Sequence, residues 1–316
     1  VRYRDYVPRF VSEFGWQAPP TWATLTESVH DDPLLPDSPG VLAHQKASDG
    51  NGKLARGLAA HFPVPKSIDD WHFVNQLNQS RAIATGIEHF RSHRGTCMGT
   101  IVWQLNDCWP VTSWAAIDGY GRVKPLWYTL RRVYQPQLLT VQPREGGLHI
   151  VTVNDAQTSW TTTVLVQRVD ADGTVPATWN ATVCTEPGSV AQLPIPGEIA
   201  APGDPRREFL VVTAGGQRAT WFFVADKDFQ YPEPRYDLTI GSGAEPTVTV
   251  TAQSVLRDVI LFADRLHPAA QVDDMLITLL PGESHVFRIS GVNELSATDI
   301  SPPVLRSAND AVPARG

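Results

Sequence analysis

The first third of the chain alternates short apolar runs with helical patterns. Residues 9–12 form a strand-like run, and a more strongly apolar run covers residues 99–105. Between them, apolar residues recur at helical spacing over 73–90, and Ser67 stands where it can cap that helix. A second helix is expected over 124–134, because a proline opens it and another proline follows it. This strand–helix–strand–helix order predicts a parallel, α/β arrangement.

The pattern changes after residue 136. Helical spacing disappears, and short β-rich runs alternate with clusters of Gly, Pro and Asp. We expect one β-sandwich over 137–228 and, after an extended linker, a second β-sandwich over 235–300. Residues 301–316 are expected to form a loosely ordered tail. The stretch 17–65, rich in Pro, Asp and Gly, is expected to be a long loop.

Residues 1–136 are too few for a complete parallel domain of the barrel type. They supply two strands and two helices, and a (β/α)₈ barrel needs eight of each. The chain also begins with Val1 rather than with Met. We therefore expect an earlier part of the domain to precede this chain.

Composition narrows the classes of function. The chain has 316 residues with 26 basic and 33 acidic side chains, a formal net charge of −7, which is unlike a nucleic-acid surface. No run of 18 apolar residues occurs, and the three cysteines are too scattered for a disulfide framework or a zinc site. We expect no nucleic-acid or membrane partner, no metal and no cofactor; the sequence predicts no location.

Glu13 is the first candidate for chemistry. It stands at the end of the first predicted strand, and catalytic groups of barrel enzymes lie at the carboxyl ends of strands. A carboxylate there is a candidate nucleophile or general acid. The alternative is that Glu13 only forms a salt bridge.

A tryptophan-rich string forms the second candidate site. Three tryptophans surround amide and carboxylate side chains in the string WQLNDCWPVTSW, residues 103–114. Aromatic faces stack on the C–H faces of sugars, while Gln, Asn and Asp bind hydroxyls, so the string favours a saccharide site. The alternative is that the tryptophans fill a core.

Three strings carry a family resemblance along essentially the whole chain: RFVSEFGWQAPP, GTIVWQLNDCWPVTSWAAIDGYGRVKPLWYTLRRVYQP and PGESHVFRI. The chain resembles the C-terminal part of the β-mannosidases of glycoside hydrolase family 2. The resemblance implies α/β plus all-β architecture: the C-terminal part of a (β/α)₈ TIM barrel over 1–136, followed by two Ig-like β-sandwich domains.

The resemblance also implies roles for four residues. Glu13, in the string SEFG, corresponds to the catalytic nucleophile. Trp103 corresponds to the aromatic floor of the terminal-sugar subsite, and Asn106 and Asp107 match the substrate-binding string. The acid/base of the family is a Glu of an Asn-Glu pair upstream of the nucleophile, and the only such pair here, at 293–294, lies in the wrong domain.

The implied activity is that of a retaining exo-acting β-mannosidase, which hydrolyses terminal non-reducing β-D-mannose residues of oligosaccharides or glycans. This chain would carry the nucleophile but not the acid/base. Two alternatives stay open: another family 2 exo-glycosidase, a β-glucosaminidase or β-galactosidase, or an accessory carbohydrate-binding unit. His44, in the loop that begins HQK, is expected either to contact substrate or to have a structural role.

Overall fold

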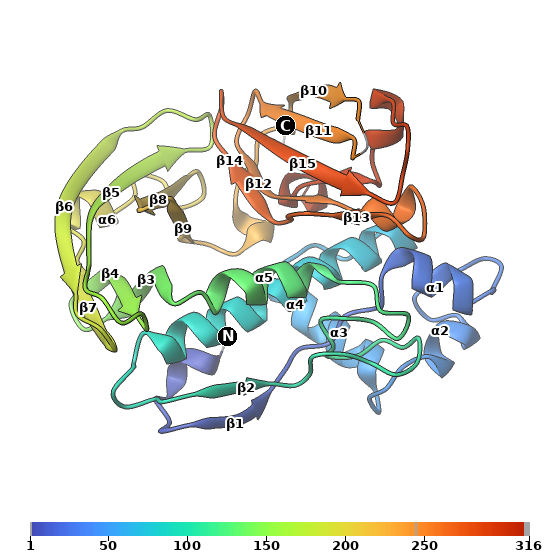
Figure 1. Cartoon of the computed structure of the whole chain (residues 1–316), viewed down its shortest axis with the longest axis horizontal. Helices are drawn as coiled ribbons and strands as arrows, with labels where there is room; N and C mark the ends of the chain where they lie inside the picture. The colour runs from blue at the N-terminus through green and yellow to red at the C-terminus, as the bar shows by residue number, and fades with distance from the viewer. Residues whose placement is uncertain (1, 244, 313–316) are drawn as a thin grey trace. The chain divides into compact units, whose positions relative to one another are not determined.

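The computed structural model describes residues 2–243 and 245–312, and they form two compact units (Figure 1). Among these residues, the first unit contains 2–14, 82–102 and 130–230, and the second contains 15–81, 103–129, 231–243 and 245–312. Helices α4 (Ile68–Arg91) and α5 (Pro125–Val133) contribute residues to both units. Both helices were expected from the sequence, and the Ser67 hydroxyl accepts a hydrogen bond from Asp70 N at 3.1 Å, which confirms the predicted cap.

The first unit contains the whole first β-rich region, residues 137–228. Besides its parts of α4 and α5, this unit contains η1 (Arg2–Asp5), β1 (Val11–Phe14), β2 (Thr100–Val102), β3 (Gln137–Arg144), β4 (Gly147–Asn154), β5 (Trp160–Asp170), β6 (Ala177–Thr185), β7 (Ser189–Pro194), α6 (Gly197–Ala200), β8 (Glu208–Ala214), β9 (Gln217–Phe222) and η2 (Asp226–Asp228).

Strands β1 and β2 pair in parallel and lie side by side in Figure 1. Val11 stands opposite Thr100, and Phe14 stands opposite Val102, so the predicted parallel order is confirmed. The strand expected over 99–105 is shorter than predicted. The backbone beyond Val102 turns away because Leu105 O accepts hydrogen bonds from the amides of residues 116 and 117.

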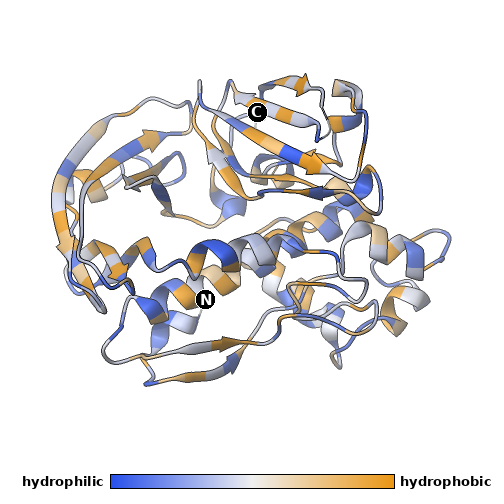
Figure 2. Ribbon diagram, viewed as in Figure 1, coloured by the Kyte–Doolittle hydropathy of each residue, from blue (hydrophilic) through white to orange (hydrophobic). Residues whose placement is uncertain are grey.

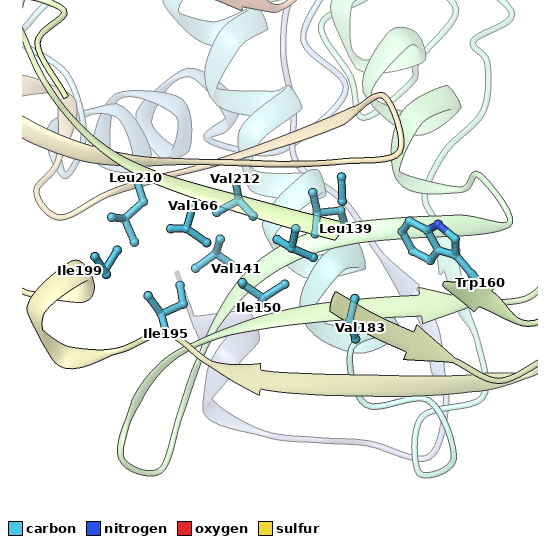
Figure 3. Packing of buried hydrophobic residues seen from close by; sticks show 12 residues of the cluster. Leu139, Val141, Ile150, Trp160, Val166, Val183, Ile195, Ile199, Leu210 and Val212 are labelled. Atoms are coloured by element: carbon cyan, nitrogen blue, oxygen red, sulfur yellow. The ribbon is translucent and has the colours of Figure 1, made fainter. Parts of the chain in front are cut away.

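The antiparallel strands of the first unit form two sheets. One has the order β3-β4-β7 and the other β6-β5-β8-β9. Apolar residues appear as orange bands between paler ones along β5 and β6 (Figure 2). Figure 3 shows Val166 and Leu210 of one sheet pointing toward Val141 and Ile150 of the other. This period-two alternation, with one face in the core, is why the sequence pattern identified these strands.

The second unit begins with three helices where the sequence analysis expected a loop. Its elements are α1 (Trp22–Ser28), α2 (Pro39–Ala43), α3 (Gly50–Ala59), β10 (Tyr236–Gly241), β11 (Thr247–Ala252), β12 (Leu256–Leu261), η3 (Ala263–Arg265), β13 (Gln271–Val272), β14 (Ile277–Leu279), β15 (Ser284–Ser290), η4 (Ala297–Ile300), β16 (Leu305–Arg306) and η5 (Ala308–Ala311).

The prediction of a loop over 17–65 is therefore wrong. Each helix contributes only one or two apolar residues to a shared cluster, in which Leu25, Val41 and Leu54 pack with Trp71 of α4. Each helix therefore has too few apolar positions for helical periodicity to be recognised in the sequence. Packing against α4 stabilises them instead.

The second β-rich region of the chain forms two small sheets, β10-β11-β15-β13 and β14-β12-β16. The expectation of a loosely ordered tail is wrong for its described residues. Leu305 and Arg306 pair with β12, and Asn309 is buried. Arg306 Nη2 also donates to Asp70 Oδ1 of α4 at 2.8 Å, which fixes the tail to the helix.

In the part of the chain that the structure describes, Cys97, Cys108 and Cys184 are free thiols. No helix among the described residues has the length and apolar content needed to cross a membrane.

The buried cluster of the first unit predicts a local stability effect. Leu210 is fully buried in β8, so Leu210→Ala should cost about 2–5 kcal/mol through lost transfer energy and a cavity. Hydrogen exchange of the β5 and β8 amides, followed by mass spectrometry, should accelerate. Val175→Ala, at a position 41% exposed, is the matched control and should change little. Unchanged exchange in β5 and β8 of Leu210→Ala would contradict the assigned core.

Candidate functional site

Glu13 lies in the first unit, near the carboxyl end of β1. Its side chain is exposed. The neighbouring Phe14 is opposite Val102, the last residue of β2, so the parallel pairing brings the carboxyl ends of both strands to one edge. The Phe14 ring packs edge-to-face on the rings of Tyr3 and Phe90, and this packing fixes the end of β1. The local structure therefore presents a carboxylate to solvent from a packed strand end.

The tryptophan-rich loop, residues 103–114, lies in the second unit. Trp103 follows β2 in the chain and is 47% exposed, and the Trp103–Gln104 peptide bond is cis. Asn106 is exposed as well, and its side-chain amide donates to Asp107 O at 3.2 Å. The loop thus presents one indole and one amide side chain to solvent close together in the chain.

Asp107 differs from its neighbours because its side chain is only 1% exposed. Its Oδ1 accepts hydrogen bonds from Lys46 Nζ at 3.0 Å and Gln104 Nε2 at 3.3 Å. Its Oδ2 accepts a short hydrogen bond from Ser113 Oγ. A buried carboxylate needs donors in place of the water it loses, and Lys46, Gln104 and Ser113 supply them here.

The segment His44–Lys46 is bound along the tryptophan-rich loop. Thr112 N donates to His44 O at 2.8 Å, and Lys46 N donates to Thr112 O at 3.2 Å. The His44 ring is anchored through Nδ1, which donates to Pro110 O at 2.6 Å. These bonds make the two segments a single local structure.

Gln45 fixes the same segment from its other side. Its Oε1 accepts hydrogen bonds from Gln17 Nε2 at 3.0 Å and from Ala47 N at 3.1 Å, and its Nε2 donates to Asn51 Oδ1 at 2.7 Å. Gly50 lies so close to Gln45 that an added Cβ would be 2.2 Å from Gln45 Cδ. The backbone on both sides of Lys46 is therefore held firmly in place.

Side chains of α4 bind the backbone of residues 16–20, the segment that follows β1. Gln79 Nε2 donates to Trp16 O at 2.7 Å, and Gln76 Nε2 donates to Pro19 O at 2.9 Å. His72 Nε2 donates to Pro20 O at 2.9 Å. This segment holds two prolines, which lack N–H groups, so side chains rather than a strand ladder satisfy most of its carbonyls.

Lys124, at the start of α5, is the most deeply buried cation at the site. Its ammonium donates to Ala18 O at 3.2 Å. Burial lowers the pKa of Lys124 to about 7, although the charges of Asp107 and Asp118 act in the opposite direction. Asp118 accepts hydrogen bonds from four donors, two in Thr21 and the amides of residues 120 and 122.

Gly15, directly after β1, lies so close to the backbone of Trp103 that only glycine fits there. A Cβ on Gly15 would stand 2.1 Å from Trp103 O, a backbone atom. A larger residue would displace the peptide group of Trp103, which explains on steric grounds why the string SEFG ends in glycine.

The structure brings together three of the four predicted site residues. Trp103, Asn106 and Asp107 share one loop of the second unit, whereas Glu13 belongs to the first unit. Trp103 and Asn106 are exposed as a binding role requires, but Asp107 is buried. The role of Lys46 was not predicted from the sequence. The HQK string marks its segment, but Lys46 and Asp107 are 61 positions apart, and no spacing pattern connects them.

Among the described residues, no group of three or more His, Cys, Asp or Glu side chains could hold a metal ion. The chemistry that these side chains can perform is that of an exposed carboxylate, an exposed indole and hydrogen-bonding amide and ammonium groups.

Comparison with known proteins connects the chain to β-mannosidases. No family model matches it. β-Mannosidase B of Thermothelomyces thermophilus is 27% identical over 336 residues, which cover 91% of this chain and 38% of that protein. The β-mannosidase of Capra hircus is 32% identical over 160 residues, which cover 46% of this chain and 18% of that protein. The chain therefore spans less than two-fifths of these relatives.

Solved structures agree in fold. The β-D-mannosidase of Dictyoglomus thermophilum superposes with a TM-score of 0.84 at 24% identity, over 97% of this chain and 38% of that one. An exo-chitosanase of Amycolatopsis orientalis superposes with a TM-score of 0.68 at 19% identity, over 92% of this chain and 40% of that one. The resemblance to the C-terminal portion of β-mannosidases is confirmed, and the relatives are glycoside hydrolases.

The buried Lys124 predicts a pH effect on stability. Folded Lys124 releases its proton near pH 7, whereas an unfolded lysine keeps its proton to about pH 10.5. The unfolded chain therefore binds more protons between these values, so this residue makes the free energy of unfolding rise with pH across that window. In Lys124→Met this contribution should be absent, and chemical denaturation from pH 7 to 10.5 should show a flatter profile.

Lys66→Met is the control, because Lys66 is exposed and should leave the profile as in the unaltered protein. Parallel profiles for Lys124→Met and the unaltered protein would show that Lys124 does not titrate in this window.

Proposed function

We propose that the chain is the C-terminal part of a retaining exo-acting β-mannosidase, which removes terminal non-reducing β-D-mannose from oligosaccharides or glycans. The observation that supports this best is an exposed Glu13 at the carboxyl end of a parallel strand, in a chain that aligns with β-mannosidases over 91% of its length. Because the chain spans 38% of such a relative, we propose that the remaining catalytic groups lie in a preceding part of the same protein.

In this proposal, β1 and β2 are the last two strands of a (β/α)₈ barrel, and the two β-rich regions are Ig-like domains. The parallel β1–β2 pair and the facing antiparallel sheets of the first unit support this assignment. The domains would cover 1–136, 137–228 and 235–300, with 301–316 as the terminal segment.

Glu13 would act as the nucleophile. Its carboxylate attacks the anomeric carbon while the glycosidic C–O bond breaks and the departing oxygen takes a proton from the acid/base outside this chain. Water, deprotonated by that same residue, then attacks the anomeric carbon and releases mannose and free Glu13. The exposed side chain of Glu13 supports this role, because the attacking carboxylate must reach the substrate.

Trp103, Asn106 and Asp107 would form the terminal-sugar subsite. The exposed indole of Trp103 offers a flat apolar surface for a pyranose ring, and the exposed Asn106 amide can bind a hydroxyl. Asp107, which is buried, would act from beneath the loop rather than at its surface.

The role of Glu13 predicts a large catalytic loss. In the polypeptide as encoded by its gene, Glu13→Gln should lower kcat on 4-nitrophenyl β-D-mannoside by several orders of magnitude, because the covalent step is lost. A 2-deoxy-2-fluoro mannosyl fluoride should label Glu13, as peptide mass spectrometry would detect. Glu145→Gln is the control and should retain activity. Labelling of another carboxylate would refute the assignment.

Parallel assays with 4-nitrophenyl β-D-glucosaminide and β-D-galactoside test the alternative exo-glycosidases. Higher kcat/KM on either one than on the mannoside would replace β-mannosidase by that activity, while the nucleophile assignment would stand.

The role of Trp103 predicts a loss that depends on aromaticity. Trp103→Ala should lower kcat/KM strongly, roughly 10–100-fold or more, because the stacking surface disappears, whereas Trp103→Phe should retain most activity. Steady-state kinetics on protein whose circular dichroism matches the unaltered form would measure this. If kcat/KM per folded molecule stays unchanged in Trp103→Ala, Trp103 has only a structural role.

A further inference from the structure

The hydrogen bonds of Asp107 leave it unable to reach a sugar. Its side chain is 1% exposed, and its two oxygens already accept from Lys46, Gln104 and Ser113. A group with this burial cannot bind a hydroxyl at the surface of the loop. Any effect of Asp107 on substrate must therefore pass through one of its three partners.

Lys46 is the most exposed of these three partners, since Gln104 is half-buried and Ser113 is buried. Its side chain is 29% exposed, and its ammonium has three N–H donors. Asp107 is the one group among the described residues to which this ammonium donates, at 3.0 Å. Two donors of a fixed cation therefore stay available for another acceptor.

The ammonium of Lys46 also lies next to the proposed sugar surface. Lys46 Nζ and Gln104 Nε2 donate to the same oxygen, Asp107 Oδ1, so the two nitrogens are close neighbours. Gln104 follows Trp103 directly in the chain and donates to Asn106 O at 2.6 Å. Lys46 thus stands within the group of residues proposed to bind the terminal sugar.

Both ends of the Lys46 side chain are fixed before substrate arrives. The backbone at Lys46 is bonded to Thr112, and the preceding Gln45 amide is bonded on both sides. A lysine side chain usually loses conformational entropy when it binds a ligand. Here most of that entropy is already lost in the folded protein, so binding costs less. This preorganisation is what a specificity-determining donor requires.

We propose that Lys46 donates a hydrogen bond to one hydroxyl of the terminal mannose, and that Asp107 is the positioning residue that holds its ammonium. This inference rests on the proposed function. A charged donor makes a stronger hydrogen bond than a neutral one, so a substrate without that hydroxyl should be discriminated against.

The test combines enzyme variants with substrate variants. In the polypeptide as encoded, kcat/KM is measured for 4-nitrophenyl β-D-mannoside and its 2-, 3-, 4- and 6-deoxy derivatives. Lys46→Met should lose roughly 10–100-fold on the parent mannoside. On the one deoxy derivative that lacks the bound hydroxyl, the same variant should lose almost nothing, because the hydrogen bond is already absent.

Asp107→Asn should show the same substrate pattern in weaker form, because Lys46 keeps its donors but loses its fixed position. Lys46→Met leaves a buried carboxylate without its cation, so the double variant Lys46→Met with Asp107→Asn, which restores a neutral pair, is measured as well. It should repeat the pattern of Lys46→Met. Lys53→Met, at an exposed position on α3, is the control and should act like the unaltered enzyme on all five substrates.

Equal losses of Lys46→Met and the double variant on all five substrates would overturn the inference, because they would assign Lys46 a structural role only. That outcome would leave the proposed function intact. Absence of turnover of every mannoside by the unaltered enzyme would overturn the proposed function and this inference together.

Discussion

The burial of the Asp107 carboxylate, which is 1% exposed, is the constraint on which the candidate site depends. A charge taken from water costs several kcal/mol unless donors replace the lost solvent, and a single missing partner costs about 3–5 kcal/mol. The donors here are Lys46, Gln104 and Ser113, from two segments far apart in the chain. The fold can bury Asp107 only if it also joins those segments, so the shape of the loop and the placement of the ammonium have one cause.

A second polar constraint supports the first. Residues 17–20 are buried in the second unit and include two prolines, so no complete strand ladder can form. Helix α4 supplies the missing donors from His72, Gln76 and Gln79, and Lys124 binds Ala18 O. This explains why α4 buries amides and a histidine on a face that packing alone would make apolar.

The sequence was informative where structure is determined locally. The helical periodicity of α4 and the alternating strands of the first unit follow from neighbouring residues, and the strand–helix–strand order predicts the parallel β1–β2 pair. Helices α1, α2 and α3 were not predicted from the sequence, because packing in a cluster around Trp71 stabilises them and their own apolar periodicity is weak. At the site, the motif identified the residue types, but it could not show that Asp107 is buried, since Lys46 is 61 residues away.

The ion pair between Asp70 and Arg306 has a consequence for the order of synthesis. The two residues are 236 positions apart, so at about 5–20 residues per second the ribosome needs roughly 10–50 s to add the arginine after the aspartate. Asp69, which lies beside Asp70 at the amino end of α4, pairs with Arg265. Both carboxylates therefore lack their arginine partners during much of that time. The helix that holds residues 16–20 therefore gains these two partners only after residues 265 and 306 have been added, and its amino end stays without them until then.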